Sequence, residues 1–174
     1  MSDTTDAFDL SAQAGRIDGW PHWQQVVQAA WREAAQQGGE MWLQDATFAD
    51  WPLGWTDAVQ AWHDWAVTQR RAQAHLLALD WGAAQQAHPR WFRWQPTWTH
   101  RVHLRVLPQE ELGGMGGFGP IMVLGGSLAL WLDDPEQWRG GWSRSAQIVR
   151  TMTQKVDANL QRSSDSGGAS MLGL

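Results

Sequence analysis

Residues 74–88 read AHLLALDWGAAQQAH, which is an apolar run, one acidic residue and then a stretch rich in alanine and glutamine. The apolar run at 74–79 is short and predicts a buried strand. Asp80 belongs to the residue types that favour helix N-caps, so we expect a short helix over 81–88. A strand that passes directly into a helix is the unit from which α/β folds are built.

The sequence before this unit repeats the same order of elements. Residues 18–39 predict a helix that begins near Pro21 and ends at a glycine pair. The run MWLQD at 41–45 predicts a strand, and Thr56 is a candidate cap for a second helix. Helix and strand therefore alternate through the first half of the chain.

The second half continues this order and then changes. Residues 98–107 alternate in polarity, as a half-buried strand does. Residues 120–124 and 127–132 predict two strands joined by a tight Gly-Gly turn, and a last amphipathic helix is expected to begin near Ser143. The whole order predicts an α/β fold: a partly parallel sheet flanked by helices, which ends in an antiparallel hairpin and a C-terminal helix.

We expect a single α/β domain over residues 18–162, between a flexible leader at 1–17 and a disordered tail at 163–174. The chain has 174 residues, of which 43% are hydrophobic, so it can build a core. It has no cysteine, which excludes disulfides, thiolate metal sites and a cysteine nucleophile. It has no apolar run of about 18 residues and a polar, acidic beginning, so we expect a cytoplasmic protein with no membrane partner.

Tryptophan is unusually frequent, with 15 residues, while tyrosine is absent. Each tryptophan can bury about 150–250 Å², and the ring is so large that it is rarely buried completely. We therefore expect some rings to lie half-exposed at grooves or at a partner surface. Tryptophan and arginine are both frequent in binding hot spots, so this composition favours a protein that works by binding.

Segment 88–105, HPRWFRWQPTWTHRVHLR, has four arginines and no acidic residue in a chain of net charge −5. Cations follow a phosphate backbone and flat rings stack on bases, so this interleaving suits nucleic acid or another phosphorylated ligand. In a strand, Arg101, His103 and Arg105 would share one face. Alternatively, the arginines pair with the protein's own carboxylates and the rings fill its core. The candidate ligand-binding residues are Arg90, Arg93, Trp94, Arg101, His103 and Arg105.

Metal binding has a weaker basis in the sequence. His100 and His103 are three residues apart, and in a strand they would point to opposite faces. Asp45 and Asp80 each follow a predicted parallel strand, where open α/β sheets bind ligands, and could together hold Mg²⁺ against a phosphate. Alternatively, Asp80 is a helix cap and Asp45 a turn residue. Since no motif requires a cofactor, we expect none.

The order of elements over roughly residues 22–160 resembles one half of a phospholipase-D-like domain. In that family a hairpin carries the motif HxK(x)4D, in which the histidine is the nucleophile and the lysine and aspartate support it. His103, Arg105 and Glu110 stand at these three places, with arginine in place of lysine and glutamate in place of aspartate. The resemblance thus implies candidate catalytic residues with two substitutions.

A second alignment of this motif fits the hairpin better and places Phe118, Pro120 and Gly125 at the three positions. None of these residue types could perform the chemistry, so the resemblance implies a catalytically inert relative. The chain also resembles proteobacterial proteins that share a WPL loop, here at 51–53, and an HPR segment, here at 88–90. That second resemblance implies no particular activity.

These observations predict a non-catalytic α/β domain that acts through protein–protein binding or self-association. The apolar residues Met171, Leu172 and Leu174 could dock in a groove of the partner. One alternative is a phosphodiesterase or nuclease with His103 as nucleophile or base. In that enzyme Arg105 could bind phosphate but could not transfer a proton, because arginine stays charged. The other alternative is a single-stranded nucleic-acid-binding module that uses segment 88–105.

Overall fold

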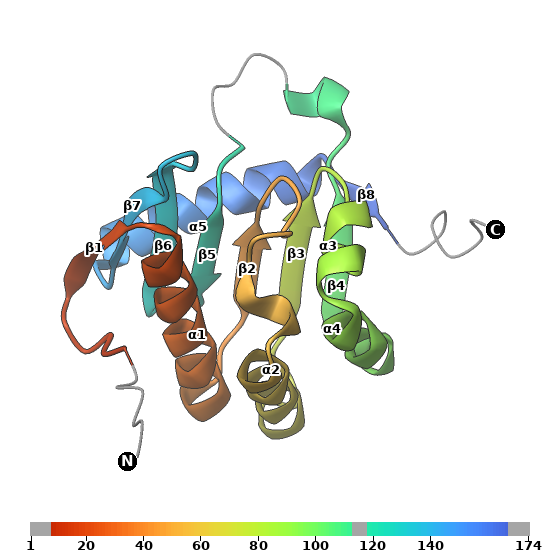
Figure 1. Ribbon diagram of the computed structural model, residues 1–174, viewed down its shortest axis with the longest axis horizontal. Coiled ribbons are helices and arrows are strands. Elements are labelled where there is room, and N and C mark those ends of the chain that lie inside the picture. The colour runs from red at the N-terminus through yellow and green to blue at the C-terminus, as the bar shows by residue number, and fades with distance from the viewer. Residues whose placement is uncertain (1–7, 113–117, 167–174) are drawn as a thin grey trace.

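A single mixed sheet organises the computed structural model, which describes residues 8–112 and 118–166 (Figure 1). In this part of the chain eight strands pair in the order β1-β7-β6-β5-β2-β3-β4-β8. Strands β2, β3 and β4 are parallel to one another, and every other pair is antiparallel. The strands are β1 (Ala14–Asp18), β2 (Met41–Gln44), β3 (Ala74–Ala78), β4 (Val102–Val106), β5 (Ile121–Leu124), β6 (Leu128–Asp134), β7 (Arg139–Ser143) and β8 (Ser164–Asp165).

Helices cover the two faces of this sheet unequally. In Figure 1 the helix α5 (Ala146–Gln161) lies behind the sheet, and the other α-helices lie in front of it. Three short 3₁₀ turns, η1 (Pro52–Gly54), η2 (Gln95–Trp98) and η3 (Gln109–Leu112), complete the connections. The four helices in front are α1 (Trp20–Gln37), α2 (Thr56–Thr68), α3 (Gly82–Ala87) and α4 (Pro89–Trp94). The predicted α/β class is therefore confirmed, with helices on both faces and a helix after the hairpin.

Two strands lie in segments that were expected to be outside the fold. Strand β1 lies in the expected leader except for its last residue, Asp18; it pairs with β7, and its Ile17 side chain is buried. Strand β8 falls within the expected tail and pairs with the end of β4. Both are short strands whose partners are distant in sequence, so local periodicity could not predict them.

The segment before β4 also differs from the prediction. The expected strand over 98–107 is shorter, because a helix and a 3₁₀ turn occupy residues 89–98. Pro89 and Pro96 each stand in the first turn of one of these elements, where the missing N–H of proline costs no hydrogen bond. Ser143, the expected cap of the last helix, ends β7 instead, and α5 follows Ser145.

Most of the tryptophans build the layer between the sheet and helices α1–α4. Six of them are essentially inaccessible to solvent: Trp23, Trp31, Trp51, Trp62, Trp65 and Trp91. Their rings meet in favourable edge-to-face contacts, such as Trp23 on Trp51 with centroids 5.0 Å apart and Trp62 on Trp91 with centroids 5.6 Å apart. Trp20 and Trp55, by contrast, keep 44% and 47% of their surface exposed. Most of the additional tryptophans are therefore part of the core, and few of them lie exposed on the surface.

Candidate functional site

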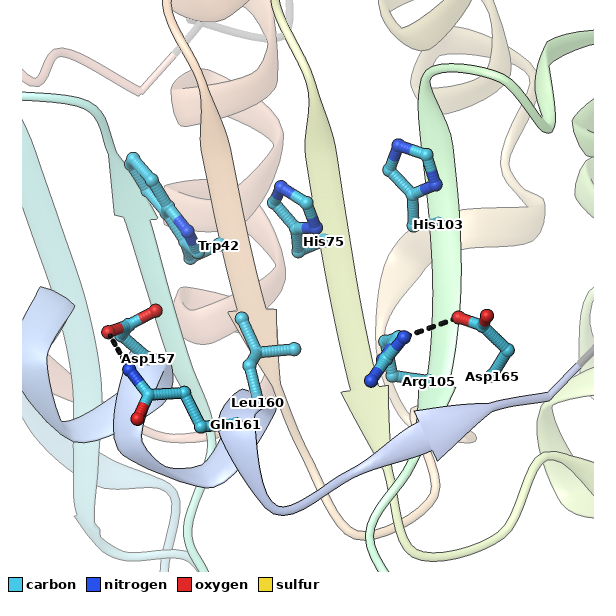
Figure 2. A pocket seen from close by; sticks show the side chains of 8 residues that line it. All are labelled: Trp42, His75, His103, Arg105, Asp157, Leu160, Gln161 and Asp165. Carbon is cyan, nitrogen blue, oxygen red and sulfur yellow. Dashed lines mark hydrogen bonds and ion pairs between the residues drawn. The ribbon is translucent and has the colours of Figure 1, made fainter.

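The face of the sheet that α5 covers is only partly closed. Helix α5 packs on β2, β5 and β6, while residues of β3 and β4 line a hollow together with the end of α5 and β8. The hollow has a volume of about 330 Å³ (Figure 2). We call it the histidine pocket, and its lining residues are Trp42, His75, His103, Arg105, Asp157, Leu160, Gln161 and Asp165.

Three aromatic side chains form a row along the floor of the histidine pocket. Trp42, His75 and His103 are direct neighbours in the register of β2, β3 and β4, so they lie at one level of the sheet (Figure 2). The Trp42 and His75 ring centroids are 6.5 Å apart, and those of His75 and His103 are 5.1 Å apart, with planes inclined by about 20°. Because side chains alternate along a strand, the row faces away from the tryptophan core.

The two histidines differ in their hydrogen bonds. His103 Nε2 lies 2.6 Å from Gln73 Oε1. An amide oxygen only accepts, so Nε2 is the donor of this hydrogen bond. Among the described residues, the His75 ring has no hydrogen-bond partner. Burial lowers the pKa of His75, and the neighbouring His103 lowers it further, which favours the neutral form of the imidazole.

Arg105 supplies the positive charge of the histidine pocket, and residues around β8 hold it. Its Nε donates to Ser163 Oγ at 3.0 Å, and one terminal nitrogen donates to the Ser163 carbonyl at 2.8 Å. The other terminal nitrogen pairs with the Asp165 carboxylate. The Arg105 side chain is 26% exposed, whereas that of Asp165 is 81% exposed. Ser163 therefore orients the arginine, and the carboxylate that balances its charge is exposed to solvent.

The last turn of α5 adds acidic and apolar groups to the opposite wall. Gln161 Nε2 donates to the Asp157 carboxylate at 2.9 Å, and Leu160 points toward the row of rings (Figure 2). Asn159 Nδ2 donates to Gln44 Oε1 at 2.7 Å and so fixes the end of the helix on β2. The pocket thus combines a cation, two carboxylates, two imidazoles and an indole.

The sheet divides the predicted basic segment between two sides of the molecule. Arg90, Arg93 and Trp94 lie on α4, in the layer opposite the histidine pocket. Arg90 donates to Thr56 Oγ1 on α2, and Trp94 Nε1 lies 3.4 Å from His63 Nδ1. Of the six predicted ligand-binding residues, only His103 and Arg105 come together in the pocket.

Arg101 does not continue the row of His103 and Arg105, as the strand prediction implied. Strand β4 begins one residue later, and the Arg101 side chain is 4% exposed. Its guanidinium donates to the carbonyls of Ala66, Gln69 and Ala72 and lies 4.9 Å from the centre of the Trp65 ring. Helix ends leave carbonyls without partners, so Arg101 is drawn to the end of α2.

The two aspartates proposed for magnesium bind their own turns. The Asp45 carboxylate accepts hydrogen bonds from the N–H groups of Phe48 and Thr47, and burial raises its pKa. Asp80 accepts from the N–H of Gly82 at 3.1 Å. Across residues 8–112 and 118–166, no group of three or more His, Cys, Asp or Glu side chains is placed to hold a metal ion. The magnesium site stays a prediction.

The three candidate catalytic residues are not assembled. His103 and Arg105 lie in the histidine pocket, but Glu110 is an exposed residue of η3 that does not line it. The predicted partner-binding residues Met171, Leu172 and Leu174 fall outside the described residues.

Sequence reasoning missed Trp42, His75 and the two acidic residues of the pocket. A parallel strand buried on both faces is apolar throughout, so a polar or amphipathic residue at matching positions of β2, β3 and β4 indicates an open face. Residues 42, 75 and 103 carry that signal, but it can be read only once the register is known.

Compared with protein-family models and with curated proteins, the chain matches none. The phospholipase-D-like resemblance therefore stays a prediction. None of the helices in the described part of the chain has the length and apolar character needed to cross a membrane.

Proposed function

We propose that this chain is a non-catalytic binding domain whose ligand occupies the histidine pocket. One observation carries the proposal: three neighbouring strands present Trp42, His75 and His103 in a row beside Arg105, on the part of the sheet that α5 leaves open. Ligand sites in proteins combine apolar and aromatic walls with a few convergent polar groups. The histidine pocket has this composition.

The contacts within the pocket favour binding over catalysis. His103 Nε2 already has a hydrogen-bond partner in Gln73, and Arg105 is held by the hydroxyl and the carbonyl of Ser163. Glu110, the third residue that the phospholipase-D-like motif would use, lies outside the pocket. The division of segment 88–105 between two faces likewise favours a compact ligand over a nucleic-acid strand that follows the whole segment.

Calorimetric titration with four small compounds tests the proposal: AMP, adenosine, benzoate and benzamide. We expect at least one of them to bind saturably. Trp42→Ala should weaken that binding about tenfold, because the indole contact is lost. Trp55→Ala, which removes an exposed ring outside the pocket, is the matched control and should leave the affinity unchanged. The proposal is wrong if no compound binds, or if both variants weaken binding equally.

The non-catalytic part of the proposal has a separate test. Incubation with a chromogenic phosphodiester, with and without Mg²⁺, should yield no turnover. Hydrolysis by the wild type that disappears in His103→Gln would instead support the phosphodiesterase alternative, in which the free Nδ1 of His103 attacks or accepts a proton.

Binding to a partner protein, or to a second copy of the chain, is the second candidate. Trp20 and Trp55 favour it, because they are large apolar side chains left exposed. Trp20 Nε1 donates to the Asp50 carbonyl, in the loop that leads to Trp55. Sedimentation of the wild type and of a Trp20→Ser, Trp55→Ser double variant tests self-association. A monomer in both cases would exclude self-association through these two side chains.

A further inference from the structure

We infer that the ligand of the histidine pocket carries a phosphate or carboxylate group, and that Asp165 occupies the position of this group until the ligand binds. The inference rests on the proposed function and adds the chemical class of the ligand. It depends on how Arg105 is held.

Two hydrogen bonds to Ser163 hold the Arg105 side chain independently of Asp165. Its Nε and one terminal nitrogen are fixed by the hydroxyl and the carbonyl of Ser163, and the remaining terminal nitrogen faces the carboxylate. Ser163 lies two residues after the end of α5, which Asn159 anchors to Gln44 of β2. The guanidinium therefore keeps its orientation toward the pocket, with one donor group available to an anion.

Asp165 is a replaceable partner for that donor. Its side chain is 81% exposed, and it belongs to a strand of two residues. Ion pairs with an exposed member contribute little, because water and salt screen them and the side chain loses conformational freedom. An oxyanion held within the pocket can also contact the imidazole row, which lines the same hollow.

His103 is placed to help hold the same anion. It lies two residues before Arg105 on β4, so both side chains extend from the same face of the strand. Its Nε2 is held by Gln73, and its ring lines the pocket together with Arg105. The imidazole therefore lies where it can contact an anion bound to Arg105.

The matched compounds of the titration separate charge from shape, since each pair differs mainly in the anionic group. AMP should bind more tightly than adenosine if the ligand is a phosphate, and benzoate more tightly than benzamide if it is a carboxylate. Arg105→Gln should lower the affinity of the preferred anion about tenfold or more, because a charge-assisted hydrogen bond is lost. The affinity of the neutral partner compound should stay unchanged.

Asp165→Asn tests the competition directly. It should tighten binding of the anion about two- to fivefold, the size of an exposed ion pair. Asp157→Asn is the matched control, because it removes the same charge from the opposite wall without freeing Arg105, and its effect should be smaller.

The outcomes distinguish this inference from the proposed function. Equal affinity for charged and neutral compounds would overturn the inference alone, as would an Asp165→Asn variant that binds no more tightly than Asp157→Asn. Absence of binding by all four compounds would overturn the proposed function as well.

Discussion

The two faces of the sheet use aromatic residues in opposite ways. On the side of α1–α4, six tryptophans are enclosed by four helices and by each other. On the side of α5, Trp42 and two histidines stand in a row that a single helix leaves accessible. The difference lies in coverage, not in composition. An aromatic side chain becomes part of the core or part of a site according to what the next layer places above it.

Removing one ring from each face should give the largest contrast. Trp62 contacts Trp31, Trp65 and Trp91 and is fully buried, so Trp62→Ala should lower the free energy of unfolding by about 3–5 kcal/mol. Trp42 is only half-buried, and Trp42→Ala should cost about 1–2 kcal/mol. Urea denaturation measures both. Similar losses for the two variants would mean that the pocket row is core.

The two arginines of β4 and its preceding turn extend the contrast to charged groups. Arg101→Gln should lower stability by about 2–3 kcal/mol, because buried carbonyls at the end of α2 lose their partner. Arg105→Gln should cost less than about 1 kcal/mol, since its ion-pair partner is exposed. Urea denaturation of the two variants measures both losses of stability. A larger loss for Arg105 would make it a structural residue and weaken its assignment to the ligand.

A smaller effect is expected from the titration of His75. Burial and His103 lower its pKa in the folded protein, so the unfolded chain binds a proton more readily. The contribution of the neutral ring to stability is therefore complete above the ordinary pKa of 6.5. It is lost as the pH falls below that value through the folded-state pKa. In His75→Gln, stability should decline less between pH 7 and pH 5 than in the wild type, and an unchanged decline would contradict this account.

Element types and the α/β class could be predicted from the sequence because each depends on local pattern. The runs MWLQD and AHLLAL predict strands from their apolar residues. Each of them contains a strand of the sheet, and a helix follows each strand. Strands β1 and β8 could not be predicted, because their stability comes from the neighbours β7 and β4 rather than from their own composition.

Only part of the candidate site could be predicted from the sequence. His103 and Arg105 are close in sequence and share a strand face, so alternation alone brings them together. Trp42, His75 and Asp165 join them through the register of β2, β3, β4 and β8, which is set by tertiary pairing. Arg101 shows the opposite case. Carbonyl groups at the end of α2 accept hydrogen bonds from its guanidinium, so its side chain does not follow the alternation of the strand.

The most direct test of the histidine pocket follows the ring signals of the six histidines by NMR during titration with AMP and with benzoate. His75 and His103 lie in the pocket, whereas His22, His63, His88 and His100 belong to the helical layer or its turns. The account predicts saturable shifts of the His75 and His103 signals while the other four stay unchanged. Shifts confined to the helical layer would contradict it and would assign the ligand to the face of Arg90 and Arg93.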